Sequence, residues 1–140
     1  MIDFPTRDQT ATYIETDPYT TADIFKSIDI ERVVPYTQLR QRDHGQTEGN
    51  SQYIVISRTD PIAVETKPAG SMADFLSAHA GSLIFAGMLT DDSGETGLGA
   101  LYVLDVAGRD MADKFVAEEP LSYGPDGRSL TSGRWRFGHV

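Results

Sequence analysis

Leu83-Ile84-Phe85-Ala86-Gly87-Met88-Leu89 is a continuous apolar run, and a second one, Ala100-Leu101-Tyr102-Val103-Leu104, follows it closely. Residues 90–97 between them contain aspartate, serine, threonine and glycine, which are typical of a turn. Two apolar runs of strand length on either side of turn residues predict a β-hairpin. The segments on either side of this hairpin then decide the fold class.

On the N-terminal side of the hairpin, the sequence predicts a strand followed by a helix. Residues 52–57 form an apolar run that is typical of a central strand, and Asp60-Pro61 is expected to end it. Ser71-Met72-Ala73-Asp74 resembles a capping box and predicts a helix that runs through His79. One face of this helix carries Met72, Phe75, Leu76 and His79.

On the C-terminal side, the sequence predicts a second helix over residues 109–118 and a weaker strand over residues 134–137. This helix is expected to bury Met111, Ala112, Phe115 and Val116. From residue 52 the predicted order is strand, helix, strand, strand, helix, strand, which is typical of the ferredoxin-like unit. The predicted fold class is therefore α+β, with a ferredoxin-like antiparallel sheet of four or five strands and its helices on one face.

The N-terminal segment repeats part of this pattern. Residues 7–19 and 109–121 align at an offset of 102 positions, with an arginine, an aspartate and a proline identical. Such a repeat indicates a reused structural unit. We expect a helix over residues 6–17, capped by Thr6 or Asp8, and a strand over residues 24–34. The predicted division is a segment with a linker, residues 1–50, and a domain, residues 51–140.

The composition excludes several classes of function. The 140 residues carry a formal net charge of −9, whereas nucleic acids and anionic membrane surfaces are bound by basic proteins. No apolar run is long enough to cross a bilayer, and no signal-peptide pattern is visible. The absence of cysteine excludes disulfides and thiolate chemistry. We therefore expect a cytoplasmic protein that binds neither nucleic acid nor membrane.

Neither a metal nor a cofactor is expected. Three scattered histidines without any cysteine give no zinc-ligand spacing. Asp91, Asp92 and Glu95 supply oxygen ligands, but their spacing does not match a calcium loop, and a solvated turn is the simpler interpretation. No helix follows the glycines of this region, so they are not a dinucleotide fingerprint.

These elements resemble the YCII-related (YciI-like) family of small ferredoxin-like proteins. The resemblance runs through residues 67–70, the hairpin strands and the helix that ends at Glu119-Pro120-Leu121, and Asp17-Pro18-Tyr19 resembles the closing part of the same domain. It implies a homodimer built as a dimeric α/β barrel. It also implies a small-molecule enzyme, lyase- or isomerase-like, that performs proton abstraction or elimination on a small organic acid.

The resemblance also implies which residues carry the chemistry. In the family, a histidine and the aspartate of an Asp-Pro pair act as acid and base. Here Gly70 stands at the position of that histidine and Glu119 at the position of that aspartate, whereas Asp17-Pro18-Tyr19 keeps the unaltered motif. The domain of residues 51–140 therefore lacks the imidazole of the acid–base pair.

Asp17 is the candidate catalytic base, because a carboxylate at a helix C-terminus is pushed toward its protonated form. The alternative is that Asp17 caps the next helical turn, with Pro18 at its first position. His79 and His44 are the candidate assisting groups. The alternative for His79 is a buried, hydrogen-bonded histidine, and the alternative for His44 is a solvated side chain.

Three further residues are expected to bind the substrate: Tyr19, Arg134 and Arg136. The two arginines would orient an anion, and the alternative is an ordinary strand with solvated arginines. Two functions follow from these assignments. The first is the YciI-like enzyme with Asp17 as its base. The second is a non-catalytic ligand-binding or assembly module that kept the fold after losing the histidine, as Gly70 indicates.

Overall fold

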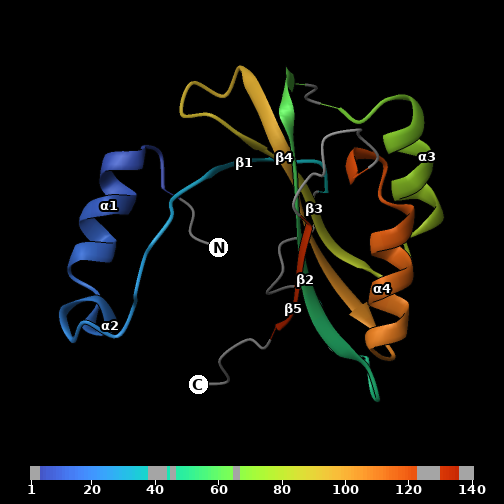
Figure 1. Ribbon diagram of the computed structural model, residues 1–140, viewed down its shortest axis with the longest axis horizontal. Coiled ribbons are helices and arrows are strands. Elements are labelled where there is room, and N and C mark those ends of the chain that lie inside the picture. The colour runs from blue at the N-terminus through green and yellow to red at the C-terminus, as the bar shows by residue number, and fades with distance from the viewer. Residues whose placement is uncertain (1–3, 38–43, 45–46, 65–66, 123–129, 136–140) are drawn as a thin grey trace.

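Five strands form one antiparallel sheet in the computed structural model, which describes residues 4–37, 44, 47–64, 67–122 and 130–135 (Figure 1). The strands are β1 (Arg32–Pro35), β2 (Ser51–Ala63), β3 (Leu83–Thr90), β4 (Thr96–Val106) and β5 (Leu130–Trp135). They lie in the order β1-β3-β4-β2-β5, and each neighbouring pair is antiparallel. Helices α3 (Gly70–Ala78) and α4 (Arg109–Glu118) interleave with strands β2 to β5. The fold is therefore α+β, and its order is compatible with the predicted ferredoxin-like unit.

The predicted hairpin of β3 and β4 is confirmed, and β2 pairs with the other edge of β4. Val103 of β4 lies opposite Phe85 of β3 and opposite Ile54 of β2. The prediction that Asp60-Pro61 ends β2 is wrong, because the strand continues to Ala63. Its pairing with β4 is irregular between Arg58 and Ile62, so the proline, which has no N–H to donate, sits where the ladder is already interrupted.

Helices α3 and α4 cover one face of the sheet and bury an aromatic core (Figure 1). The ring centroids of Phe75 and Phe115 are 4.7 Å apart, and those of Tyr102 and Phe115 are 5.1 Å apart. Burial is confirmed for Met72, Phe75, Ala112 and Phe115. Met111 was expected to be buried but is 50% exposed, since it lies beside the apolar stripe of α4 rather than on it.

The predicted capping box of α3 is wrong. Ala69 is the N-cap residue, and no side chain caps the helix. Gly70 follows with a φ of +52°, in the left-handed region that favours glycine. The backbone rather than a serine side chain therefore sets the start of α3.

The second face of the sheet carries an apolar stripe on β2 and β4. Ile56 lies directly opposite Leu101, and Ile54 lies opposite Val103. Val103 is buried with Phe85, whereas Ile54, Ile56 and Leu101 are only partly buried. Figure 1 shows α3 and α4 on the other face, so no helix of the described chain packs directly on this stripe.

Residues 4–31 form an extension that we call the arm. Helix α1 (Arg7–Glu15) begins at Thr6, whose hydroxyl accepts a 3.3 Å hydrogen bond from the backbone N–H of Gln9, as predicted. A short helix, α2 (Pro18–Thr21), follows. Figure 1 shows both helices set apart from the sheet, on the side opposite α3 and α4.

The predicted strand over residues 24–34 is largely wrong. Only β1 (Arg32–Pro35) is a strand, and it pairs with the edge of β3. The alternation that suggested a longer strand does not mark a buried face, because Ile24, Phe25 and Ile28 are all exposed. The arm thus joins the sheet of the main domain at its end. None of the described helices is both long and apolar enough to cross a membrane.

Candidate functional site

Asp17 lies in the arm, where its carboxylate caps α2. Its Oδ1 accepts a 2.9 Å hydrogen bond from the backbone N–H of Tyr19, and Pro18 occupies the first position of the helix. Asp17 and Tyr19 both line an open hollow of about 340 Å³, together with Tyr13 and Phe25. The structure therefore brings Asp17 and Tyr19 together. It also gives Asp17 the capping role that was its alternative interpretation.

His79 lies on the helix-covered side of the sheet, at the C-terminal end of α3. Its Nε2 is 3.0 Å from Oε2 of Glu118 on α4. Its ring packs between Phe75 and Phe115, with centroid distances of 4.6 and 4.9 Å. The side chain is 17% exposed, so His79 is the largely buried, hydrogen-bonded histidine of the alternative interpretation.

His44 was expected to be solvated if it had no catalytic role, and it is not. Its Nε2 is 3.1 Å from Oδ2 of Asp105, which also accepts a 3.2 Å hydrogen bond from the backbone N–H of Thr47. Burial raises the pKa of Asp105, but the hydrogen bonds from Thr47 and His44 outweigh it and hold that pKa below its usual range. Oδ1 of Asp105 is buried without a hydrogen-bond partner among the described residues.

The expected arginine pair is described only in part. Arg134 lies exposed on β5, and its Nη2 donates a 3.2 Å hydrogen bond to Oγ of Ser51. Arg136 lies outside the described residues. The three groups thus lie in separate places. Asp17 is in the arm and His79 is in the helix layer. His44 is beside Asp105 of β4, whose side chain points away from the helices by strand alternation. The expected assistance of Asp17 by either histidine has no geometric support.

The structure reveals a cluster that the sequence analysis missed, formed by Ser57, Tyr102 and Glu119. Oε1 of Glu119 accepts a 2.7 Å hydrogen bond from the hydroxyl of Tyr102 and a 3.2 Å bond from Oγ of Ser57. Glu119 is 0% exposed, and it follows α4 directly. Burial, together with the charge of Glu119, raises the pKa of Tyr102.

A signal for this cluster is present in the sequence. Ser57 and Tyr102 are polar positions within apolar strands, and Glu119 precedes a proline at a helix end. Strand alternation places Ser57 on the face of Tyr53 and Val55, which the helices cover. The family resemblance pointed to Asp17 instead, because Asp17-Pro18-Tyr19 keeps the motif, whereas position 119 carries glutamate.

Gly70, at the position of the family histidine, has open space around it. A Cβ added there would meet no atom within 4 Å. Its left-handed φ of +52° nevertheless strains any residue with a side chain. A histidine at this position would therefore require a different start of α3.

The acidic stretch between β3 and β4 forms a turn that Asp91 holds together. Oδ1 of Asp91 accepts hydrogen bonds from the side chain of Ser93 and from the backbone N–H groups of Gly94, Glu95 and Thr96. The hydrogen bond from Ser93, with those of Thr96 and Glu95, lowers the pKa of Asp91 to about 2. No group of three potential metal ligands occurs among the described residues.

Comparison with protein-family models, curated proteins and solved structures finds no match to this chain.

Proposed function

We propose that this chain is a non-catalytic module of the YciI-like kind, which assembles as a homodimer through the second face of its sheet. The separation of its candidate acid–base groups supports the non-catalytic part. General acid–base catalysis needs such groups within hydrogen-bond reach of one substrate. Asp17 caps α2, His79 pairs with Glu118, and His44 pairs with Asp105, so each group already serves a local structural role.

The apolar stripe of the second face supports the homodimer. Ile54, Ile56 and Leu101 remain partly exposed in the single chain, although they lie in the middle of the sheet. Two sheets that pack face to face stand about 10 Å apart and interdigitate such side chains. Pairing two copies through this face would give the dimeric α/β barrel that the family resemblance implies.

Sedimentation equilibrium tests this proposal. We expect a mass of twice the 15.4 kDa of one chain. Ile56→Asp should give a folded monomer, because a charge would be buried between the sheets. Ser77→Asp is the matched control, since Ser77 is exposed on α3, and it should remain dimeric. A protein concentration of about 100 µM lies well above the dissociation constant of a specific dimer. A wild-type chain that is still monomeric at this concentration contradicts the proposal.

A second candidate function is the proton-transfer enzyme, and one observation favours it. The buried Glu119, at the position of the family acid, is held by the hydroxyls of Tyr102 and Ser57. In this function Glu119 would be the base and Tyr102 its hydrogen-bond donor. We rank it second because a catalytic base must come within hydrogen-bond reach of its substrate, whereas Glu119 and Tyr102 are both 0% exposed.

A screen of small carboxylic acids separates the two functions. Thermal shift reports binding, and mass spectrometry reports any product. If the chain is a non-catalytic module, no product should form from any acid that stabilises the protein. The enzyme predicts a product that disappears in Glu119→Gln. Asp17→Asn keeps the cap of α2, because asparagine caps as well as aspartate, so its effect reports the charge of Asp17 alone.

A further inference from the structure

The open hollow of the arm has the size of a site for one small molecule. Its volume is about 340 Å³, and the described residues that line it all lie between positions 13 and 28. Small-molecule sites are typically clefts of roughly 300–1,000 Å³, with apolar and aromatic walls and a few polar groups. The hollow is formed by one continuous segment, so it is complete within a single chain.

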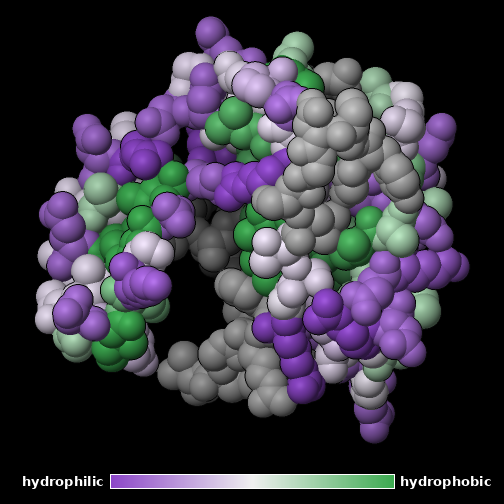
Figure 2. Space-filling model, in the orientation of Figure 1, coloured by the Kyte–Doolittle hydropathy of each residue, from purple (hydrophilic) through white to green (hydrophobic). Residues whose placement is uncertain are grey.

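The walls of the hollow are largely aromatic. Tyr13, Tyr19 and Phe25 line it, and each of these rings is exposed. The ring centroids of Tyr19 and Phe25 are 6.3 Å apart. One ammonium group can therefore lie within about 6 Å of both centroids, which is the range of a cation–π interaction. Figure 2 shows apolar side chains gathered over α1 and α2, beside the open space that borders the arm.

The backbone of the arm sets the positions of these two rings. The N–H of Ile24 donates a 3.1 Å hydrogen bond to the backbone oxygen of Tyr19, and the N–H of Asp23 donates a 3.0 Å bond to that of Thr20. Asp23 has a φ of +53°, which aspartate adopts more readily than most residues. The turn after α2 is thereby closed, and it brings Phe25 beside Tyr19.

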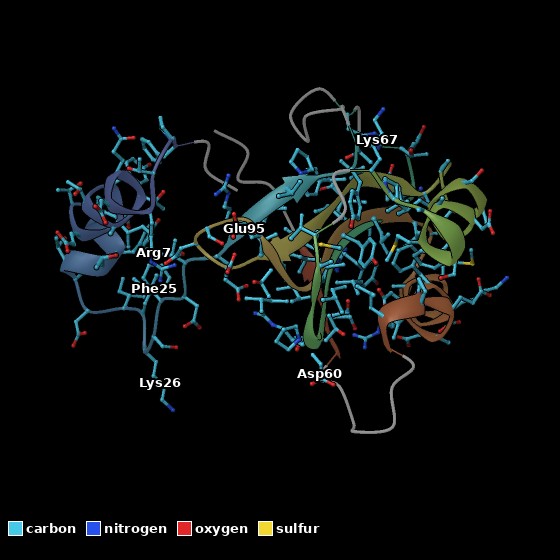
Figure 3. All side chains as sticks on the ribbon, turned by 90° about the horizontal axis from the view of Figure 1, so that it is seen from above. Arg7, Phe25, Lys26, Asp60, Lys67 and Glu95 are labelled. Carbon is cyan, nitrogen blue, oxygen red and sulfur yellow. The ribbon has the colours of Figure 1, made fainter. Side chains whose placement is uncertain are left out.

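The hollow carries a negative charge that its own walls do not neutralise. Asp17 is the only charged residue among the described residues that line it. Its Oδ1 caps α2, whereas its Oδ2 has no hydrogen-bond partner among the described residues. The arm has two cationic side chains, Arg7 and Lys26, and neither lines the hollow. Figure 3 shows Lys26 projecting away from the two helices, whereas Phe25 lies beside them.

A second polar group at the hollow also lacks a partner. Thr20 lines the hollow, and its Oγ1 is buried without a hydrogen-bond partner in the part of the chain that the structure describes. Most buried polar atoms of native proteins have a partner, either from the protein itself or from an ordered molecule. A bound molecule with a polar head would supply one.

We infer that the hollow of the arm binds a small organic cation, with its ammonium group beside Asp17 and against the rings of Tyr19 and Phe25. The carboxylate supplies the opposite charge, and the rings supply cation–π contacts and cover the apolar part of the ligand. This ligand is opposite in charge to the organic acid that the family resemblance implies. An acid would bring a second carboxylate to Asp17, and no described cation lines the hollow to offset the repulsion.

Three probes of similar shape test the charge of the ligand. They are the cation choline, the neutral 3,3-dimethylbutan-1-ol and the anion 3,3-dimethylbutanoate. Each is titrated into the full chain labelled with nitrogen-15, and the backbone amide signals of residues 13–28 are followed. Choline should shift these signals with a dissociation constant on the order of 1 mM, as expected for a ligand of so few atoms. The alcohol and the anion should bind more weakly by about threefold or more.

Variants of two lining residues test the two sources of affinity. Asp17→Asn removes the charge and keeps the cap of α2, so it should raise the dissociation constant of choline about threefold. Asp8→Asn is the matched control, because it removes the same charge from an exposed position of α1 outside the hollow. Tyr19→Leu removes a ring and should also weaken binding, whereas Tyr19→Phe keeps the ring and should not. The amide spectrum of each variant establishes that the arm is folded.

Four results would overturn the inference. Equal binding of choline and the alcohol would show that the hollow responds to apolar shape alone. Tighter binding of the anion would assign the hollow to an acid. An effect of Asp17→Asn no larger than that of Asp8→Asn would remove the carboxylate from the site. Unchanged amide signals of residues 13–28 at about 20 mM choline would show that no cation binds there. The homodimer is tested separately, because every described lining residue comes from one chain.

Discussion

The hydroxyl of Tyr102 on β4 donates a 2.7 Å hydrogen bond to the carboxylate of Glu119, and both side chains are fully buried. This bond connects the centre of the sheet to the chain just after α4. Because Ser57 on β2 donates to the same oxygen, one carboxylate joins two strands and the end of a helix. The cluster therefore stabilises the helix-covered half of the fold whether or not it has a chemical role.

Tyr102→Phe removes this donor and changes little else in shape. A hydrogen bond to a charged group contributes roughly 1.5–3 kcal/mol, so we expect the free energy of unfolding to fall by that amount. Urea denaturation measures it. Tyr13→Phe is the control, because Tyr13 is exposed and its change should stay within about 0.5 kcal/mol. Equal effects of the two substitutions would show that the buried bond contributes nothing.

Tyr102 should also resist ionisation. Its burial and the charge of Glu119 raise its pKa above the value of about 10 in an unfolded chain. The stability that depends on its protonated form is therefore present below pH 10 and is lost as the pH rises above that value. In a rapid ultraviolet titration, one of the six tyrosines should ionise only when the protein unfolds. Ionisation of all six in the folded protein near pH 10 would contradict this.

Asp105 stabilises the fold in a way that is lost at acid pH, whereas the contribution of Tyr102 is lost at alkaline pH. Hydrogen bonds from Thr47 and His44 outweigh its burial, so its pKa in the folded protein lies below the value of about 3.9 in an unfolded chain. Its stabilisation is present above pH 4 and is lost as the pH falls through the lower pKa of the folded state. Urea denaturation of Asp105→Asn between pH 3 and 6 should show a weaker acid dependence than the wild type. The exposed Asp74→Asn should match the wild type.

Gly99 is required where β4 passes the irregular part of β2. It has a φ of +153°, and a Cβ there would lie 2.0 Å from the backbone oxygen of Ser57. We expect Gly99→Ala to lower the free energy of unfolding by about 3 kcal/mol or to prevent folding. Gly81→Ala is the control, because a Cβ there meets nothing and the change should be within about 0.5 kcal/mol. A tolerated Gly99→Ala would mean that the two strands separate easily.

The main domain could be predicted from the sequence because its apolar pattern and its burial agree. The hairpin strands and α4 lie where their periodicity predicts, and α4 spans the predicted residues 109–118. The arm could not be predicted so well. The alternation over residues 24–34 has the period of a strand, but these residues face solvent, and a pattern cannot show whether a sheet lies beneath it.

The candidate site was predicted less well than the fold, and for a different reason. Asp17 and Tyr19 were found from a local motif, and they do lie together. The contacts of His44 with Asp105 and of Glu119 with Tyr102 join residues 61 and 17 positions apart. Such contacts depend on strand register and on the direction of each side chain, which composition and local spacing do not encode.

Intermolecular nuclear Overhauser effects test the proposed assembly most directly. Chains labelled with carbon-13 would be mixed with unlabelled chains, and an isotope-filtered spectrum would record contacts between different copies only. We predict intermolecular signals from the methyl groups of Ile54, Ile56 and Leu101 on the second face of the sheet. A spectrum in which these methyl groups show contacts only within their own chain would contradict the homodimer.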